Sequence, residues 1–155
     1  MQLPIYSLEA GNNFFTYDFV SKGPKGLINK RVQFSLVHPS CVYNLSFGDL
    51  ILRLKFSMTT LLAIMVIGDY ELVLATVAAA AHEFCRHHPD ASIIAIGGTP
   101  ARTRLYQMGI ARYLDLLQMQ FTIYGELGDE WEPFQRNKPY TAFFAQPNDS
   151  FSSYL

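Results

Sequence analysis

The sequence is poor in charge and in cysteine. Charged residues make up 16% of the 155 residues, against about 25% in an average domain. The formal net charge is −1, which excludes a globally basic nucleic-acid-binding protein but leaves room for a local basic patch. Two cysteines, Cys41 and Cys85, are too few for a disulfide scaffold.

No hydrophobic run in the sequence is long enough to cross a membrane. The most apolar stretch, Leu61–Ile67, has seven residues, whereas a spanning helix needs about 20. The N-terminus lacks the basic and apolar regions of a signal peptide. We therefore predict a cytoplasmic protein that has no membrane partner.

The sequence has ample material for a hydrophobic core. Half of its residues are hydrophobic and 14% are aromatic, which excludes a disordered chain. A chain of this length buries roughly 68–70% of its unfolded surface without disulfides or metals. We predict a single domain over residues 1–146. Residues 147–155 are rich in Ser, Asn and Pro and are expected to form a flexible tail.

Residue patterns along the chain predict an α+β fold. Alternating or continuous apolar residues indicate strands over 14–20, 27–36, 41–47, 50–67 (one bent strand or two), 92–96, 119–124 and 140–146. Helical periodicity indicates helices over 71–88 and 100–117, and 125–138 is expected to be a loop that carries Trp131. The order of elements favours a mainly antiparallel β-sheet with two α-helices packed on one face.

The most informative segment is the loop and helix that follow the strand at 92–96. Gly97 and Gly98 end that strand, Thr99 suits the N-cap, and Pro100 suits the first helical position. Exposed amide groups at such a helix start favour an anion. Two cations in the first turns, Arg102 and Arg104, are unfavourable beside the positive end of the helix dipole unless an anion or a carboxylate compensates them.

A helical wheel separates the two arginines. Arg102 falls near the middle of the apolar face, so we expect it to be partly buried, either in an internal salt bridge to Asp18 or Asp49 or in contact with a ligand. Arg104 falls on the opposite side with Gln107 and is expected to face water.

Charge also clusters elsewhere in the chain. Four of the twelve cations lie within ten residues of one another, at Lys22, Lys25, Lys30 and Arg31. An acidic group lies at Glu126, Asp129, Glu130 and Glu132. A basic face formed by the first cluster would bind phosphate groups, while ordinary solvated loop charge is the competing interpretation.

The histidines and cysteines do not form a recognisable metal or nucleophile motif. On a helical wheel His82 and Cys85 lie near each other but His87 points elsewhere, whereas zinc needs three or four converging ligands. No Gly-x-Ser-x-Gly pattern and no P-loop pattern is present. We predict no metal and no cofactor.

The chain resembles a family of small uncharacterised bacterial proteins whose domain has no known function. The resemblance runs from about residue 3 to 146, and its most specific part is the arginine-bearing helix. The residues that carry it are Tyr43–Leu45, Phe47–Asp49, Val73–Ala78, Ala101–Tyr106, Ile123–Gly125 and Trp131–Phe134. The resemblance implies a compact bacterial domain and brings no established activity, substrate or catalytic residue.

Three functional hypotheses follow. The first is a non-enzymatic binding module for a phosphate or nucleic-acid group, with Arg102 as principal contact and the ligand-binding set Gly97, Gly98, Thr99, Arg102, Arg104, Tyr106, Lys22, Lys25 and Arg31. The second is a homodimeric protein-interaction module, because low charge and exposed aromatics suit an interface. The third is a small metal-independent nuclease or toxin-like protein that uses His38, Tyr106 and the two arginines.

Overall fold

The structure is a computed structural model, which describes residues 4–23, 26–49, 70–149 and 151. Its elements in chain order are β1 (Glu9–Ala10), the short 3-10 helix η1 (Asn12–Phe14), β2 (Thr16–Gly23), β3 (Gly26–His38), β4 (Val42–Asp49), α2 (Tyr70–His87), β5 (Ser92–Ile96), α3 (Pro100–Arg112), α4 (Leu114–Leu117), β6 (Phe121–Leu127), β7 (Glu130–Pro133) and β8 (Ala142–Pro147). The strand predicted over 50–67 lies outside the described residues.

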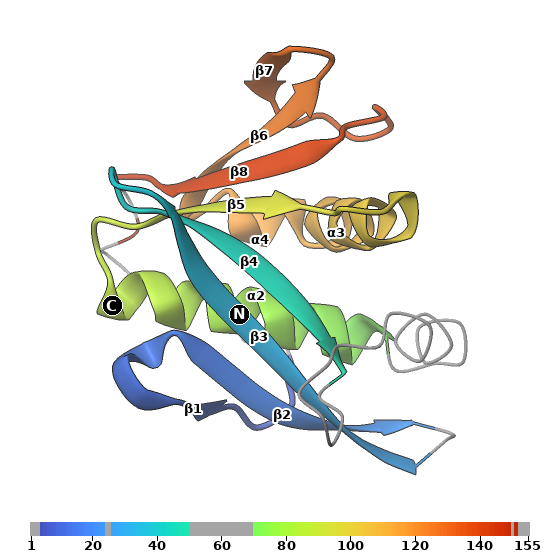
Figure 1. The fold of residues 1–155 in the computed structure, drawn as a ribbon. Coiled ribbons are helices and arrows are strands. Elements are labelled where there is room, and N and C mark those ends of the chain that lie inside the picture. The colour runs from blue at the N-terminus through green and yellow to red at the C-terminus, as the bar shows by residue number, and fades with distance from the viewer. Residues whose placement is uncertain (1–3, 24–25, 50–69, 150, 152–155) are drawn as a thin grey trace. The chain divides into compact units, whose positions relative to one another are not determined.

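The strands form one mixed sheet in the order β1-β2-β3-β4-β5-β8-β6-β7 (Figure 1). Strands β4 and β5 run parallel, while β1–β2, β2–β3, β5–β8, β8–β6 and β6–β7 are antiparallel pairs. The predicted fold class is confirmed: the chain is α+β, with a mostly antiparallel sheet and two main helices, α2 and α3.

The structure differs from the prediction in the segment over 125–138 and in the helix over 100–117. The loop predicted over 125–138 begins as the end of β6 and then contains β7, which pairs with β6 through a turn at Gly128 (φ +65°). Charged residues and a proline in β7 mask the strand pattern, as is common at a sheet edge. The helix predicted over 100–117 is interrupted at Tyr113, whose φ of −110° and ψ of 21° are not helical.

The chain divides into two compact units. Unit 1 contains residues 1–34 and 46–84, and unit 2 contains residues 35–45 and 85–155. Strands β3 and β4 and helix α2 contribute residues to both units. The single domain proposed over 1–146 stays a prediction.

Aromatic side chains form the core of unit 1. Tyr17 and Phe19 of β2 and Val32 and Phe34 of β3 are buried, at every second position of their strands. The ring of Phe34 stacks on Phe84 of α2, with centroids 4.1 Å apart and planes 6° from parallel. This contact fixes α2 against the buried face of β2 and β3.

A charged pair lies inside unit 1. Lys30 of β3 is 0% exposed and Asp49 of β4 is 1% exposed, and the Lys30 ammonium group donates directly to the Asp49 carboxylate. Arg31 instead donates to Asp18 through Nε and Nη2, at 2.7 and 2.9 Å, where both side chains are partly exposed. The two neighbouring cations of β3 therefore pair in different environments.

Unit 2 is built around β5, β6, β8 and α3. Its buried side chains include Ile93 of β5, Ile123 of β6, Phe143 of β8 and Leu105 of α3. Part of the predicted tail is described, and there Phe151 is 6% exposed. Its ring packs edge-on against Phe121, with centroids 5.4 Å apart. Residues 150 and 152–155 lie outside the described residues.

The substitution Lys30→Met tests the buried pair. It leaves the Asp49 carboxylate buried without its counter-ion, so we expect the free energy of unfolding to fall by about 3–5 kcal/mol, measured by urea denaturation. The double variant Lys30→Met/Asp49→Leu removes both charges and is expected to recover most of that loss. Arg31→Gln, on the partly exposed pair, should cost no more than about 1 kcal/mol. A single-variant loss as small as that of Arg31→Gln would contradict this account.

Candidate functional site

The turn that leads into α3 requires both of its glycines. A Cβ atom at Gly97 would lie 2.5 Å from the backbone nitrogen of Thr103, which is closer than real Cβ contacts. Gly98 has a φ of +71°, a conformation that other residues adopt only with strain. The close approach of the strand end to the helix therefore explains Gly97, and the positive φ explains Gly98.

The predicted cap of α3 is present. The Thr99 hydroxyl oxygen accepts the N–H of Arg102 at 3.2 Å, and Pro100 occupies the first helical position. The Thr99 carbonyl oxygen accepts both the N–H and the hydroxyl of Thr103, each at 3.1 Å. Thr99 thus fixes the first turn of α3 relative to the strand end.

An open groove of about 730 Å³ runs beside α3, entirely within unit 2. We call it the α3 groove. One wall is formed by the start and one side of α3, and the other by the segment that precedes β8. The lining residues are Gly98, Thr99, Pro100, Thr103, Arg104, Gln107, Met108, Ala111, Asn137, Pro139, Tyr140 and Thr141.

The lining of the α3 groove carries one cation and no carboxylate. The cation, Arg104, is exposed, as the wheel predicted. It forms no ion pair or hydrogen bond with any residue that the structure describes. The groove therefore has a positive charge that the described part of the chain does not neutralise.

Hydrogen bonds tie the second wall of the groove to α3. Nε2 of Gln107 donates to the carbonyl oxygen of Lys138. Farther along the helix, the Arg136 guanidinium donates to the carbonyl oxygen of Ala111 through Nε and Nη2, at 3.2 and 3.0 Å. These contacts join the segment before β8 to α3 at two points about one helical turn apart.

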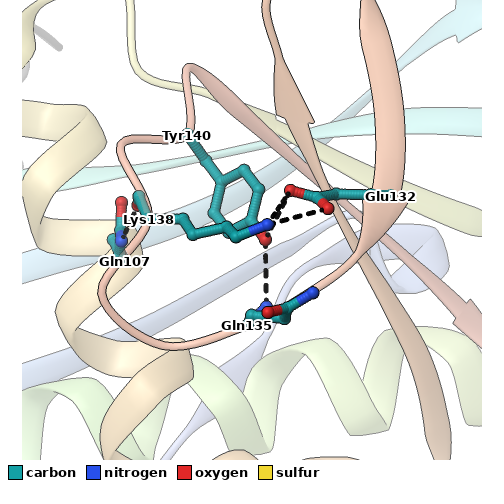
Figure 2. Close-up of polar contacts among 5 residues, drawn as sticks. All are labelled: Gln107, Glu132, Gln135, Lys138 and Tyr140. Carbon is teal, nitrogen blue, oxygen red and sulfur yellow. Dashed lines mark hydrogen bonds and ion pairs between the residues drawn. The ribbon is translucent and has the colours of Figure 1, made fainter.

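A polar network ties the same wall to the β6–β7 hairpin (Figure 2). Lys138 Nζ donates to both carboxylate oxygens of Glu132, at 3.0 and 3.1 Å. The Tyr140 hydroxyl donates to Glu132 at 3.3 Å and accepts the backbone N–H of Gln135 at 3.0 Å. The segment is therefore bound on both sides, by the hairpin and by Gln107 of α3.

The ring of Tyr140 lies directly over Gly125 of β6. A Cβ atom at position 125 would lie 2.4 Å from the ring. Tyr140 is 3% exposed, and its ring also packs edge-on against Phe143, with centroids 6.1 Å apart. Gly125 is thus the residue that lets the wall approach the sheet.

Arg102 and Tyr106 do not line the α3 groove. The Tyr106 hydroxyl donates to the carbonyl oxygen of Leu45 at 3.2 Å. Burial raises the pKa of Tyr106 to about 12, and the positive charge of Arg102 acts in the opposite direction. Arg102 is partly buried, as predicted, and its Nε has no hydrogen-bond partner among the described residues.

From the sequence, Asp18 or Asp49 was the predicted partner of Arg102 in an internal salt bridge. Asp18 is bound by Arg31 and Asp49 by Lys30, so neither needs Arg102 as its counter-ion. No described carboxylate forms an ion pair with Arg102.

The other predicted site residues lie elsewhere. Lys22 and Arg31 belong to unit 1 and do not line the α3 groove, and Lys25 lies outside the described residues. Gly97 is buried behind the turn. Of the predicted set, Gly98, Thr99 and Arg104 come together in the groove.

Sequence reasoning missed the second wall of the groove. Asn137, Pro139 and Thr141 lie more than twenty positions after the start of α3, and no local pattern links them to it. Gln107 could have been found from the sequence, because the helical wheel placed it on the same side of the helix as Arg104. Asn137 has a φ of +66°, which Asn tolerates better than most residues but which a sequence alone does not reveal.

In the part of the chain that the structure describes, no three His, Cys, Asp or Glu side chains gather closely enough to hold a metal ion. None of the helices among these residues has both the length and the apolar character needed to cross a bilayer.

Comparison with protein families gives one match. Residues 2–148 match a family described as a family of unknown function, DUF6934. The chain belongs to this family. No curated protein and no solved structure matches it. Membership of DUF6934 agrees with the resemblance found in the sequence and carries no activity with it, whereas the bacterial origin stays a prediction.

The substitution Gly125→Ala tests the packing of Tyr140 against β6. The added methyl group meets the ring, so we expect a loss of about 1–3 kcal/mol in the free energy of unfolding, measured by urea denaturation. Thr122→Ala, at an exposed position of the same strand, is the control and should change stability by less than about 0.5 kcal/mol. Equal stability of the two variants would contradict the close contact.

Proposed function

We propose that this DUF6934 protein is a binding module for a phosphate-bearing anionic group, which it holds in the α3 groove. The observation that carries the proposal is the groove's charge. Arg104 lines a cavity of about 730 Å³ that no carboxylate lines, and no described residue neutralises its guanidinium. The volume lies within the range of about 300–1,000 Å³ that is usual for small-molecule sites.

The proposal assigns the main contact to Arg104 rather than to Arg102. Arg104 lines the groove together with Gly98 and Thr99, whereas Arg102 does not line it. Arginine suits this role because its planar guanidinium donates two parallel hydrogen bonds to phosphate oxygens.

The start of α3 supplies a smaller share of the attraction. Pro100 has no N–H group, and the N–H groups of Arg102 and Thr103 are already accepted by Thr99. The positive end of the helix dipole still favours a negative ligand there. The Thr99 hydroxyl adds a polar contact along the lining, whereas the Thr141 hydroxyl already donates to the Glu126 carboxylate at 2.9 Å.

The alternative functions have weaker support. For a nuclease, Tyr106 is a poor general base, because its hydroxyl is engaged with Leu45 and its pKa is raised to about 12. His38 lies at the end of β3, where its Nδ1 is 2.6 Å from the Ser40 hydroxyl. A homodimeric interaction module remains a prediction.

Thermal unfolding in the presence of inorganic phosphate tests the proposal. At about 100 times its dissociation constant, a ligand that binds only the folded state adds about 2.7 kcal/mol, which raises Tm by roughly 5–11 °C in a domain of this size. Chloride at the same ionic strength controls for general salt effects. We expect the wild-type protein to respond to phosphate beyond the chloride response.

Two variants with the same change in charge locate the site. Arg104→Gln should abolish the phosphate-specific rise in Tm, whereas Arg102→Gln, on the same helix but outside the groove lining, should keep it. The reverse result would move the site to Arg102. No phosphate-specific rise in the wild-type protein would overturn the proposal.

A further inference from the structure

The α3 groove differs in chemistry from one end to the other. At the start of α3 its lining is polar and cationic, with Thr99 and Arg104. Farther along the helix the lining includes the apolar side chains of Met108 and Ala111, and the opposite wall contributes Pro139. A ligand that is only a phosphate ion would occupy the first part and leave the second unused.

We infer that the ligand is a nucleoside monophosphate, whose phosphate lies at Arg104 and whose base lies toward Ala111. This inference rests on the proposed phosphate site. Residues Arg104, Gln107 and Ala111 follow one another at helical spacings of three and four, so they share one side of α3. From Arg104 to Ala111 the helix rises ~10 Å, which is comparable to the distance from the phosphate of an extended nucleotide to the far edge of its base.

Two side-chain amides stand in the part of the groove assigned to the base. Each amide offers a donor and an acceptor, the combination that reads the edge of a nucleobase. Gln107 is held in place by its hydrogen bond to the Lys138 carbonyl oxygen. The Asn137 side chain is exposed and forms no hydrogen bond within the described part of the chain. Asn137 is therefore available to a ligand without breaking an internal contact.

Apolar surface next to these amides suits the faces of a base. Met108 is 41% exposed, and Pro139 on the facing wall is also exposed. A flat base that covers both would remove apolar area from water, which a phosphate ion does not. The wall that carries Pro139 and Asn137 is fastened to α3 and to the hairpin, so binding need not first order it.

Isothermal titration calorimetry with three probes separates the two parts of the ligand. The probes are inorganic phosphate, the four common ribonucleoside 5′-monophosphates, and the corresponding nucleosides. We expect at least one monophosphate to bind about tenfold or more tightly than phosphate, a gain of about 1.4 kcal/mol, and the nucleosides to bind more weakly than that monophosphate.

Substitutions of Asn137 and Gln107 then test whether their side-chain amides cause the tighter binding of the nucleotide. Asn137→Gly keeps the positive φ and removes the amide, so it should reduce the advantage of the nucleotide while the affinity for phosphate stays unchanged. Gln107→Met retains the length of the side chain but also removes the hydrogen bond that holds the second wall, so it should weaken nucleotide binding at least as much as Asn137→Gly. Arg104→Gln should weaken the binding of both probes. Circular dichroism confirms that each variant is folded.

The outcomes distinguish this inference from the proposed function. If phosphate binds but no monophosphate binds more tightly, the inference fails and the phosphate site stands. If nucleosides bind as tightly as nucleotides, the assignment of a mononucleotide is also overturned. If none of the three probes binds, the proposed function itself fails.

Discussion

The candidate site depends on the attachment of one short segment, residues 134–141, to elements on both sides of it. Tyr140 packs over Gly125 and donates to Glu132, while the Lys138 carbonyl oxygen accepts a hydrogen bond from Gln107. Without these contacts α3 would offer one exposed side and no groove. Because the segment is fixed by close packing as well as by polar contacts, the second wall exists before any ligand arrives.

Among the described residues, the cations that stabilise the fold differ from the cation that we assign to ligand binding. Lys30, Arg31 and Lys138 each pair with a carboxylate in their own unit. Arg104 lines a cavity and has no such partner among these residues. A buried charge without a counter-ion is costly, so the pairing of Lys30 serves the fold. An exposed unpaired charge costs little, and for that reason it is free to meet a ligand.

Local patterns in the sequence predicted local structure well. Apolar patterns located β2 and β3, and Thr99 and Pro100 located the start of α3. The patterns failed where contacts between distant residues determine the structure. The short edge strand β7 was not predicted, because its charged residues and its proline hide the alternation typical of a strand. The groove's second wall could not be predicted either, because Asn137 reaches α3 only through the folding of residues between them.

The most direct measurement of the central claim is an NMR titration of the labelled protein with inorganic phosphate. If the α3 groove holds the anion, the backbone amide signals of Gly98 and Thr99 and the side-chain Nε signal of Arg104 should shift together, in a saturable way. Shifts confined to Arg102 or to unit 1, or no saturable shifts at all, would contradict the assignment of the site to this groove.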